Sequence, residues 1–61
     1  MTLEQERWAE AHMVLELHGN AVFTFIAERI IVLARDGDEA GVNRWRDIAD
    51  RVTKLQIGRL H

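Results

Sequence analysis

The clearest hydrophobic periodicity lies in the C-terminal third of the chain. Apolar residues recur there at intervals of three and four, the spacing of one face of an α-helix. They are Val42, Trp45, Ile48, Ala49, Val52 and Leu55. The opposite side is polar, and the acid-before-base pairs Asp47–Arg51 and Asp50–Lys54 support a helix at i,i+4 spacing. The pattern predicts a surface helix over about residues 39–56 with one buried stripe.

The middle third is apolar around most of its circumference. Between residues 21 and 35 only Thr24, Glu28, Arg29 and Arg35 are polar. Three of them, Thr24, Glu28 and Arg35, form one narrow stripe in helical projection, and Arg29 lies apart on the apolar side. A helix with so little polar surface must be covered from more than one direction. We expect neighbouring helices to cover part of it and a second copy of the chain to cover the rest.

The first third predicts a helix over about residues 3–18. Its expected core face consists of Leu3, Trp8, Ala11, Val14 and Leu15. Met13 and Leu17 point elsewhere and form additional apolar surface. For the whole chain, the residues expected inside are Trp8, Leu15, Phe25, Ile26, Ile30, Trp45, Ile48 and Val52.

Capping residues divide the chain into these three helices. Side chains that favour N-caps stand before each one, at Thr2, Asn20 and Asp38. Glycines stand where each should end, at Gly19, Gly37 and Gly58. Gln5 follows Thr2 at the spacing of a capping box. The sequence therefore predicts an all-α, three-helix bundle-like single domain over residues 1–61, with helices at about 3–18, 21–35 and 39–56 and no strand.

Composition narrows the class of protein. With 61 residues the chain forms one domain, and an apolar fraction of 48% is too high for a disordered chain. A domain this small is marginally stable alone, so we expect dimerisation to complete the bundle. The absence of cysteine fits a reducing compartment. The first residues lack the basic and apolar regions of a signal peptide, and the apolar runs are short, so we expect a cytoplasmic protein without a membrane span.

Charge is distributed unevenly along the chain. Residues 1–20 carry four glutamates and one arginine, a formal charge of −3. Residues 38–61 carry five basic and four acidic side chains, a formal charge of +1. The first helix can therefore lie beside the third. The overall charge of −2 argues against strong electrostatic binding to nucleic acid.

Several segments resemble a family of short uncharacterised bacterial proteins. They are Trp8-Ala9-Glu10-Ala11, His18-Gly19, Phe25-Ile26-Ala27-Glu28-Arg29-Ile30, and Gly37-Asp38-Glu39-Ala40-Gly41-Val42 together with Trp45. The likeness extends from about Trp8 to Ala49 and departs from the family pattern at Ile31, where the family has a small residue. The resemblance implies a bacterial setting and no particular activity.

Metal binding and catalysis find little support in the sequence. His12 and Glu16 have the i,i+4 spacing of one edge of a metal site, with His18 nearby, but no cysteine or HExxH pattern supplies further ligands. His18 near a helix end is explained equally by the helix dipole, and His61 is the last residue. The chain has no serine and no glycine-rich phosphate loop. We expect no enzyme activity, no metal and no cofactor.

Two binding functions remain as hypotheses. The first is a protein–protein interaction module, which forms a homodimer or docks on a larger protein through Met13, Leu17, Arg29 and Ile31. If Arg29 is buried it needs a carboxylate, from Glu10, Glu16 or another chain; otherwise its stem packs and its head reaches water. The alternative is a small helix-turn-helix-like DNA-binding regulator that uses the helix 39–56.

The DNA-binding alternative rests on the segment Asn43-Arg44-Trp45-Arg46, which interleaves basic and aromatic residues. Trp45 falls within the apolar stripe, which favours its burial. The acidic residues Asp38 and Glu39 stand where a recognition helix would approach phosphates. Both features make nucleic acid the weaker of the two hypotheses.

Overall fold

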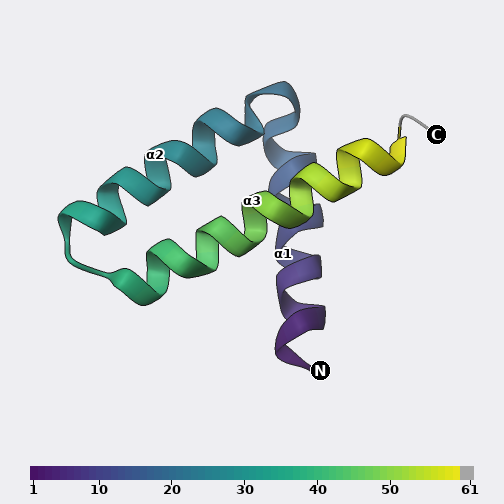
Figure 1. Ribbon diagram of the computed structural model, residues 1–61. Coiled ribbons are helices and arrows are strands. Elements are labelled where there is room, and N and C mark those ends of the chain that lie inside the picture. The colour runs from purple at the N-terminus through teal and green to yellow at the C-terminus, as the bar shows by residue number, and fades with distance from the viewer. Residues whose placement is uncertain (60–61) are drawn as a thin grey trace.

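The computed structural model describes residues 1–59, and these residues form α-helices joined by short connections. Helix α1 spans Leu3–His18, a 3-10 turn spans Gly19–Ala21, α2 spans Val22–Arg35 and α3 spans Glu39–Arg59 (Figure 1). No strand occurs within residues 1–59. The predicted all-α fold class and its three helices are confirmed.

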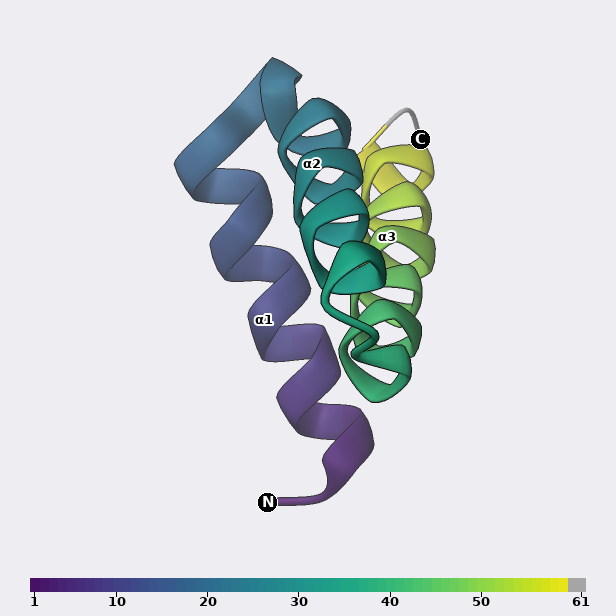
Figure 2. The same ribbon diagram turned by 90° about the vertical axis from the view of Figure 1, so that its left-hand side faces the viewer.

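The helices form two layers. α2 and α3 lie side by side as an antiparallel hairpin, and α1 crosses one face of that hairpin (Figures 1 and 2). The crossing point lies beside the start of α2 and the C-terminal half of α3. The other end of the hairpin, where α2 turns into α3, extends beyond α1. One whole face of the hairpin is therefore without a covering helix.

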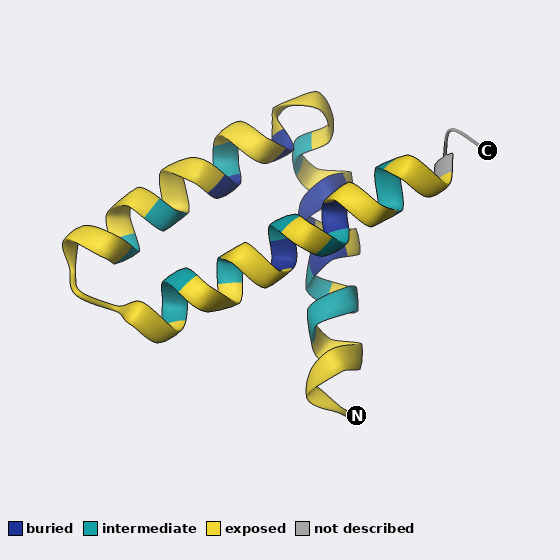
Figure 3. Cartoon of the chain, viewed as in Figure 1, coloured by how far each residue is buried: buried dark blue, intermediate teal, exposed yellow. Residues whose placement is uncertain are grey.

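The core lies where the three helices meet (Figure 3). Its buried side chains are Ala11, Val14 and Leu15 of α1, Val22 and Ile26 of α2, and Ile48 and Val52 of α3. Five residues predicted to be inside or on a core face, Phe25, Ile30, Trp45, Ala49 and Leu55, are partly buried against this cluster. Trp8 is also partly buried. Core formation thus depends on α1, because it supplies three of the seven buried side chains.

Leu3 is a correction to the predicted core face of α1. Leu3 is 64% exposed. The helical period places Leu3 on a particular side of α1, but the first turns of α1 extend past the hairpin, and no neighbouring helix reaches them (Figure 3). The helical period of α1 therefore predicts burial correctly only along the part of α1 that packs against another helix.

Two of the predicted caps are confirmed. The Thr2 hydroxyl accepts a hydrogen bond from the Gln5 amide at 3.1 Å, and the Gln5 side chain accepts one from the Thr2 amide at 2.8 Å, which is a complete capping box. The Asp38 carboxylate accepts a hydrogen bond from the Gly41 amide at 2.8 Å at the start of α3. These contacts supply acceptors to amides that have no partner within the helix.

The boundary between α1 and α2 differs from the prediction at Asn20. α2 begins at Val22, its N-cap position is Ala21, and no side chain caps it. Gly19 adopts a φ of 51°, and the chain continues directly into a 3-10 turn in which the Val22 amide donates to the Gly19 carbonyl. Because the turn supplies this acceptor from the backbone, the Asn20 side chain is not needed as a cap.

The end of α3 also differs from the prediction. The helix continues through Gly58 to Arg59 and does not stop near residue 56. A glycine inside a helix costs only about 1 kcal/mol relative to alanine, and no proline follows to prevent continuation. Gly37, by contrast, does end a helix, because its φ of 74° suits the turn between α2 and α3.

Candidate interaction surfaces

The outward face of α2 is the side turned away from the core. At 3.6 residues per turn, Glu28, Ile31 and Arg35 lie roughly opposite the buried Ile26. Ala27 and Ala34 border them, and all five residues are exposed. We define this set, Ala27, Glu28, Ile31, Ala34 and Arg35, as the α2 outer face. It presents one large apolar side chain between an acidic and a basic residue.

Among residues 1–58, whose side chains the structure describes, the charges of the α2 outer face have no ion-pair partner. The ion pairs of this range are Arg7–Glu10, Arg44–Glu10 and Lys54–Asp50. Glu28 and Arg35 are seven residues apart, too far for a direct i,i+4 pair within α2. Both charged groups are therefore available to another molecule.

A second apolar surface lies on α1. Met13 and Leu17 are spaced by four residues and lie roughly opposite the buried Leu15. Leu17 is 72% exposed. This α1 outer surface, Met13 and Leu17, points away from the hairpin that covers the other side of α1. It is therefore separate from the α2 outer face, on a different layer of the molecule.

Arg29 and Ile31, both predicted interface residues, point to different sides of α2. Two residues along a helix correspond to a rotation of about 200°. Ile31 is 49% exposed on the outer face, whereas the Arg29 guanidinium lies over the Trp45 ring, 5.7 Å from its centroid. The structure brings Met13 and Leu17 together but places Arg29 and Ile31 elsewhere.

Arg29 belongs to a row of stacked groups between the helices. His18 stacks on Phe25 with ring centroids 3.8 Å apart, and Phe25 meets Trp45 edge-on at 5.7 Å. Arg29 is exposed and forms no ion pair among the side chains that the structure describes, those of residues 1–58. Of the two predicted alternatives, the structure therefore has the one in which the stem packs and the head reaches water, with an aromatic ring as its partner.

Glu10, one of the carboxylates considered for Arg29, instead joins α1 to α3. Its two oxygens accept from Arg44 at 3.0 and 3.1 Å, and it also pairs with Arg7 at 2.9 Å. The acidic first helix thus lies beside the basic third helix, as the charge distribution predicts. This contact was not identified from the sequence, because spacing along one helix carries no information on partners from another.

The basic residues of α3 lie on several sides of the helix. Arg44 contacts Glu10, and Arg51 lies over the Trp8 ring at 5.5 Å and donates to the Asp47 carbonyl at 3.2 Å. Trp45 is half-buried and Arg46 is exposed. Of the two arginines on which the DNA-binding hypothesis rests, Arg44 is therefore occupied by a contact with α1 and Arg46 is not.

The predicted metal edge does not extend to a metal site within the described range. His12 and Glu16 are exposed, and the His18 ring stacks on Phe25. No group of three or more potential ligands gathers among residues 1–59. His61 lies outside the described residues.

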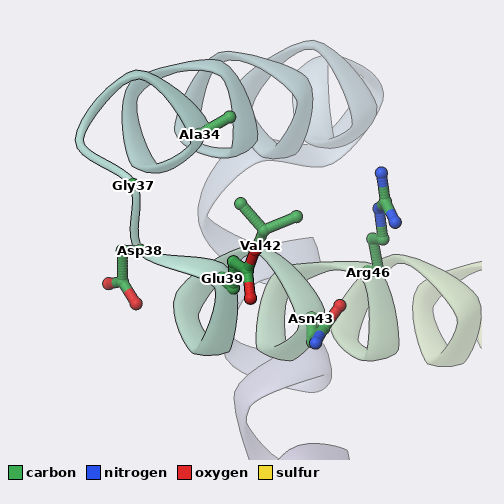
Figure 4. A pocket seen from close by; sticks show the side chains of 7 residues that line it. All are labelled: Ala34, Gly37, Asp38, Glu39, Val42, Asn43 and Arg46. Atoms are coloured by element: carbon green, nitrogen blue, oxygen red, sulfur yellow. The ribbon is translucent and has the colours of Figure 1, made fainter.

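The tip of the hairpin contains a shallow depression of about 430 Å³. Figure 4 shows the side chains of Val42 and Arg46 rising from α3 toward α2, with the Asp38 side chain turned away. The Asp38 carboxylate caps α3, and Glu39 and Arg46 both line the depression. Charges of both signs border the depression, so it has no evident preference for an anionic or a cationic ligand.

The bent helical run Leu3–Arg35 contains an 18-residue window with a mean hydropathy of 1.4. By length and composition alone this window is apolar enough to cross a membrane, and only 11% of it is buried; one helix of this kind is weak evidence for a membrane span. The 3-10 turn interrupts the run at Gly19–Ala21. α2 itself has 14 residues, about 21 Å, which is shorter than a membrane core of about 30 Å.

A family model matches residues 3–59 and so covers nearly the whole chain. The chain belongs to DUF6961, a family of unknown function. The predicted resemblance to an uncharacterised family of short proteins is confirmed. No curated protein and no solved structure matches the chain. Any function of this DUF6961 member must therefore be argued from its own surfaces, and nothing in the family description indicates catalysis.

Proposed function

We propose that the chain is a protein–protein interaction module that self-associates as a twofold homodimer. The observation that carries this proposal is the exposed apolar surface on the uncovered side of the hairpin. Ile31 lies at the centre of the α2 outer face, and Phe23, about two turns before it, is also exposed. Exposed apolar patches on small domains commonly mark interfaces.

The size of the core supports the same proposal. Only seven side chains among residues 1–58 are buried, and all lie where α1 crosses the hairpin. The far end of the hairpin has only partly buried and exposed residues (Figure 3). A second copy packed on the uncovered face would add buried apolar area, and closed twofold dimers are the commonest soluble homo-oligomers.

The chemistry of the chain is suited to the cytoplasm, where we propose that the dimer acts. It has no cysteine and so needs no oxidising compartment. The outer face of α2 includes Glu28 and Arg35, which would be costly in contact with lipid. These features favour a protein partner over a membrane.

Sedimentation equilibrium over a range of concentrations up to tens of micromolar tests the proposal. We expect the average mass to rise with concentration from 7.1 kDa toward twice that value. Ile31→Glu should keep the helical circular dichroism of the wild type and shift the mass toward the monomer, because a charge would enter the apolar centre. A folded wild-type chain that remains at 7.1 kDa throughout would refute self-association.

A further inference from the structure

We infer that two copies of the chain pair through antiparallel α2 helices, with Ile31 at the twofold axis and reciprocal Glu28–Arg35 ion pairs on either side. This inference rests on the proposed self-association and specifies its surface and register. It selects the α2 outer face over the α1 outer surface. The selection depends on which of the two faces is complementary to itself.

Charge complementarity determines the orientation. Glu28 is three residues before Ile31, and Arg35 is four residues after it. In an antiparallel pair centred on Ile31, Glu28 of one copy lies within one residue of Arg35 of the other copy, about 1.5 Å along the axis. Twofold symmetry repeats this pair on the opposite side of Ile31. A parallel pair would instead place each charge beside its own kind.

Small side chains allow the two helices to approach. Ala27 and Ala34 border Ile31 on the same face, and both are exposed. Helices pack at about 8–10 Å depending on the side chains between them, and alanine favours the shorter distance. The two Ile31 side chains can therefore meet at the centre while the longer Glu28 and Arg35 side chains bridge the edges.

A second copy fits this face better than a lipid surface does. Glu28 and Arg35 form no ion pair with the side chains of residues 1–58 and lie on the same side of α2 as Ile31. Burying this face in lipid would remove both charges from water without pairing them. The α1 outer surface, with Met13 and Leu17, offers apolar area but no pair of opposite charges to set a register.

The contact is short, and its strength follows from that length. α2 has 14 residues, about 21 Å. A single helix pair of this length lies at the small end of specific interfaces. We therefore expect the dimer to dissociate reversibly. In so small an interface, changing one charge on each copy should change the dissociation constant measurably.

Charge exchange tests the register. Sedimentation equilibrium is measured for the wild type, Glu28→Arg, Arg35→Glu and the double variant with both exchanges. Each single reversal places like charges opposite each other at two symmetric positions, and we expect dimerisation to weaken about 10- to 30-fold. The double variant restores opposite charges and should recover a dissociation constant near that of the wild type. Glu16→Arg, an exposed reversal on α1, is the matched control and should leave dimerisation unchanged.

The outcomes separate the two proposals. If the wild type dimerises but both single reversals dimerise equally well, self-association stands and this register is wrong. If the double variant remains as weak as the singles, the reciprocal ion pairs are wrong. If the wild type is a folded monomer at every concentration, or floats with phosphatidylcholine vesicles in place of dimerising, both the proposed function and this inference are wrong.

Discussion

Ile48 is the side chain through which the structural account is tested most simply, because it is fully buried at the meeting point of α1, α2 and α3. Ile48→Ala removes three carbon atoms. The transfer free energy of these atoms is about 2.4 kcal/mol, at about 0.8 kcal/mol per carbon. A cavity left by incomplete relaxation adds to this loss, so we expect a total near 3 kcal/mol. For 61 residues the free energy of unfolding is about 3–9 kcal/mol.

Urea denaturation followed by far-ultraviolet circular dichroism measures the effect, at a concentration low enough to keep the chain monomeric. Ile57→Ala is the matched control, because it makes the same substitution in the same helix at a residue that is 52% exposed. We expect the control to change the free energy of unfolding by no more than about 0.5 kcal/mol.

If Ile48→Ala prevents folding, Ile48→Val replaces it, with an expected loss of about 1 kcal/mol. Equal unfolding midpoints for the variants at residues 48 and 57 would refute the placement of the core. A change in the slope against urea would show that the variant alters the compactness of one state, and the comparison would then use the slope-corrected free energies.

Three further predictions concern local structure. Gly19→Ala should destabilise the protein by about 1–3 kcal/mol because the φ of Gly19 is positive, whereas Gly58→Ala should stabilise it by up to about 1 kcal/mol because Gly58 lies within α3. Thermal unfolding compares the two variants, and equal effects would contradict both assignments. Asp38→Ala should cost about 1 kcal/mol through the lost cap of α3, while Asp38→Asn should retain most of that stability in the same assay. Arg44→Ala should cost no more than about 1 kcal/mol, since the Arg44 side chain is half exposed, and a loss that does not shrink with added salt would argue against its pairing with Glu10.

The regular part of the fold follows from hydrophobic spacing. α3 was predictable because one buried stripe, including Ile48 and Val52, faces one pair of neighbours throughout the core. The prediction that Leu3 lies on the core face was wrong, because spacing gives the direction of a side chain and not the extent of the helix that should cover it. The predictions that Asn20 caps α2 and that Gly58 ends α3 were wrong, because the surrounding backbone conformation outweighs a local residue preference of about 1 kcal/mol.

The candidate surfaces were only partly predictable for a related reason. Met13, Leu17 and Ile31 are exposed apolar side chains, as the helical projections indicate. The projections do not contain the crossing of α1 over the hairpin, so they could not show that the α1 outer surface and the α2 outer face lie on separate layers. The contact between Arg29 and the Trp45 ring could not be predicted from the projections either, because Trp45 comes from another helix.

The most direct test of the central claim uses the absence of cysteine from the native chain. Ile31→Cys and Leu17→Cys each introduce one thiol, on the α2 outer face and on the α1 outer surface. If two copies pair across Ile31, mild oxidation of Ile31→Cys should rapidly give a covalent dimer at twice the 7.1 kDa chain mass, because the two sulfurs meet at the twofold axis. Leu17→Cys should form such a dimer only slowly, through random collisions. Faster crosslinking of Leu17→Cys, or equally slow crosslinking of both variants, would contradict pairing through α2.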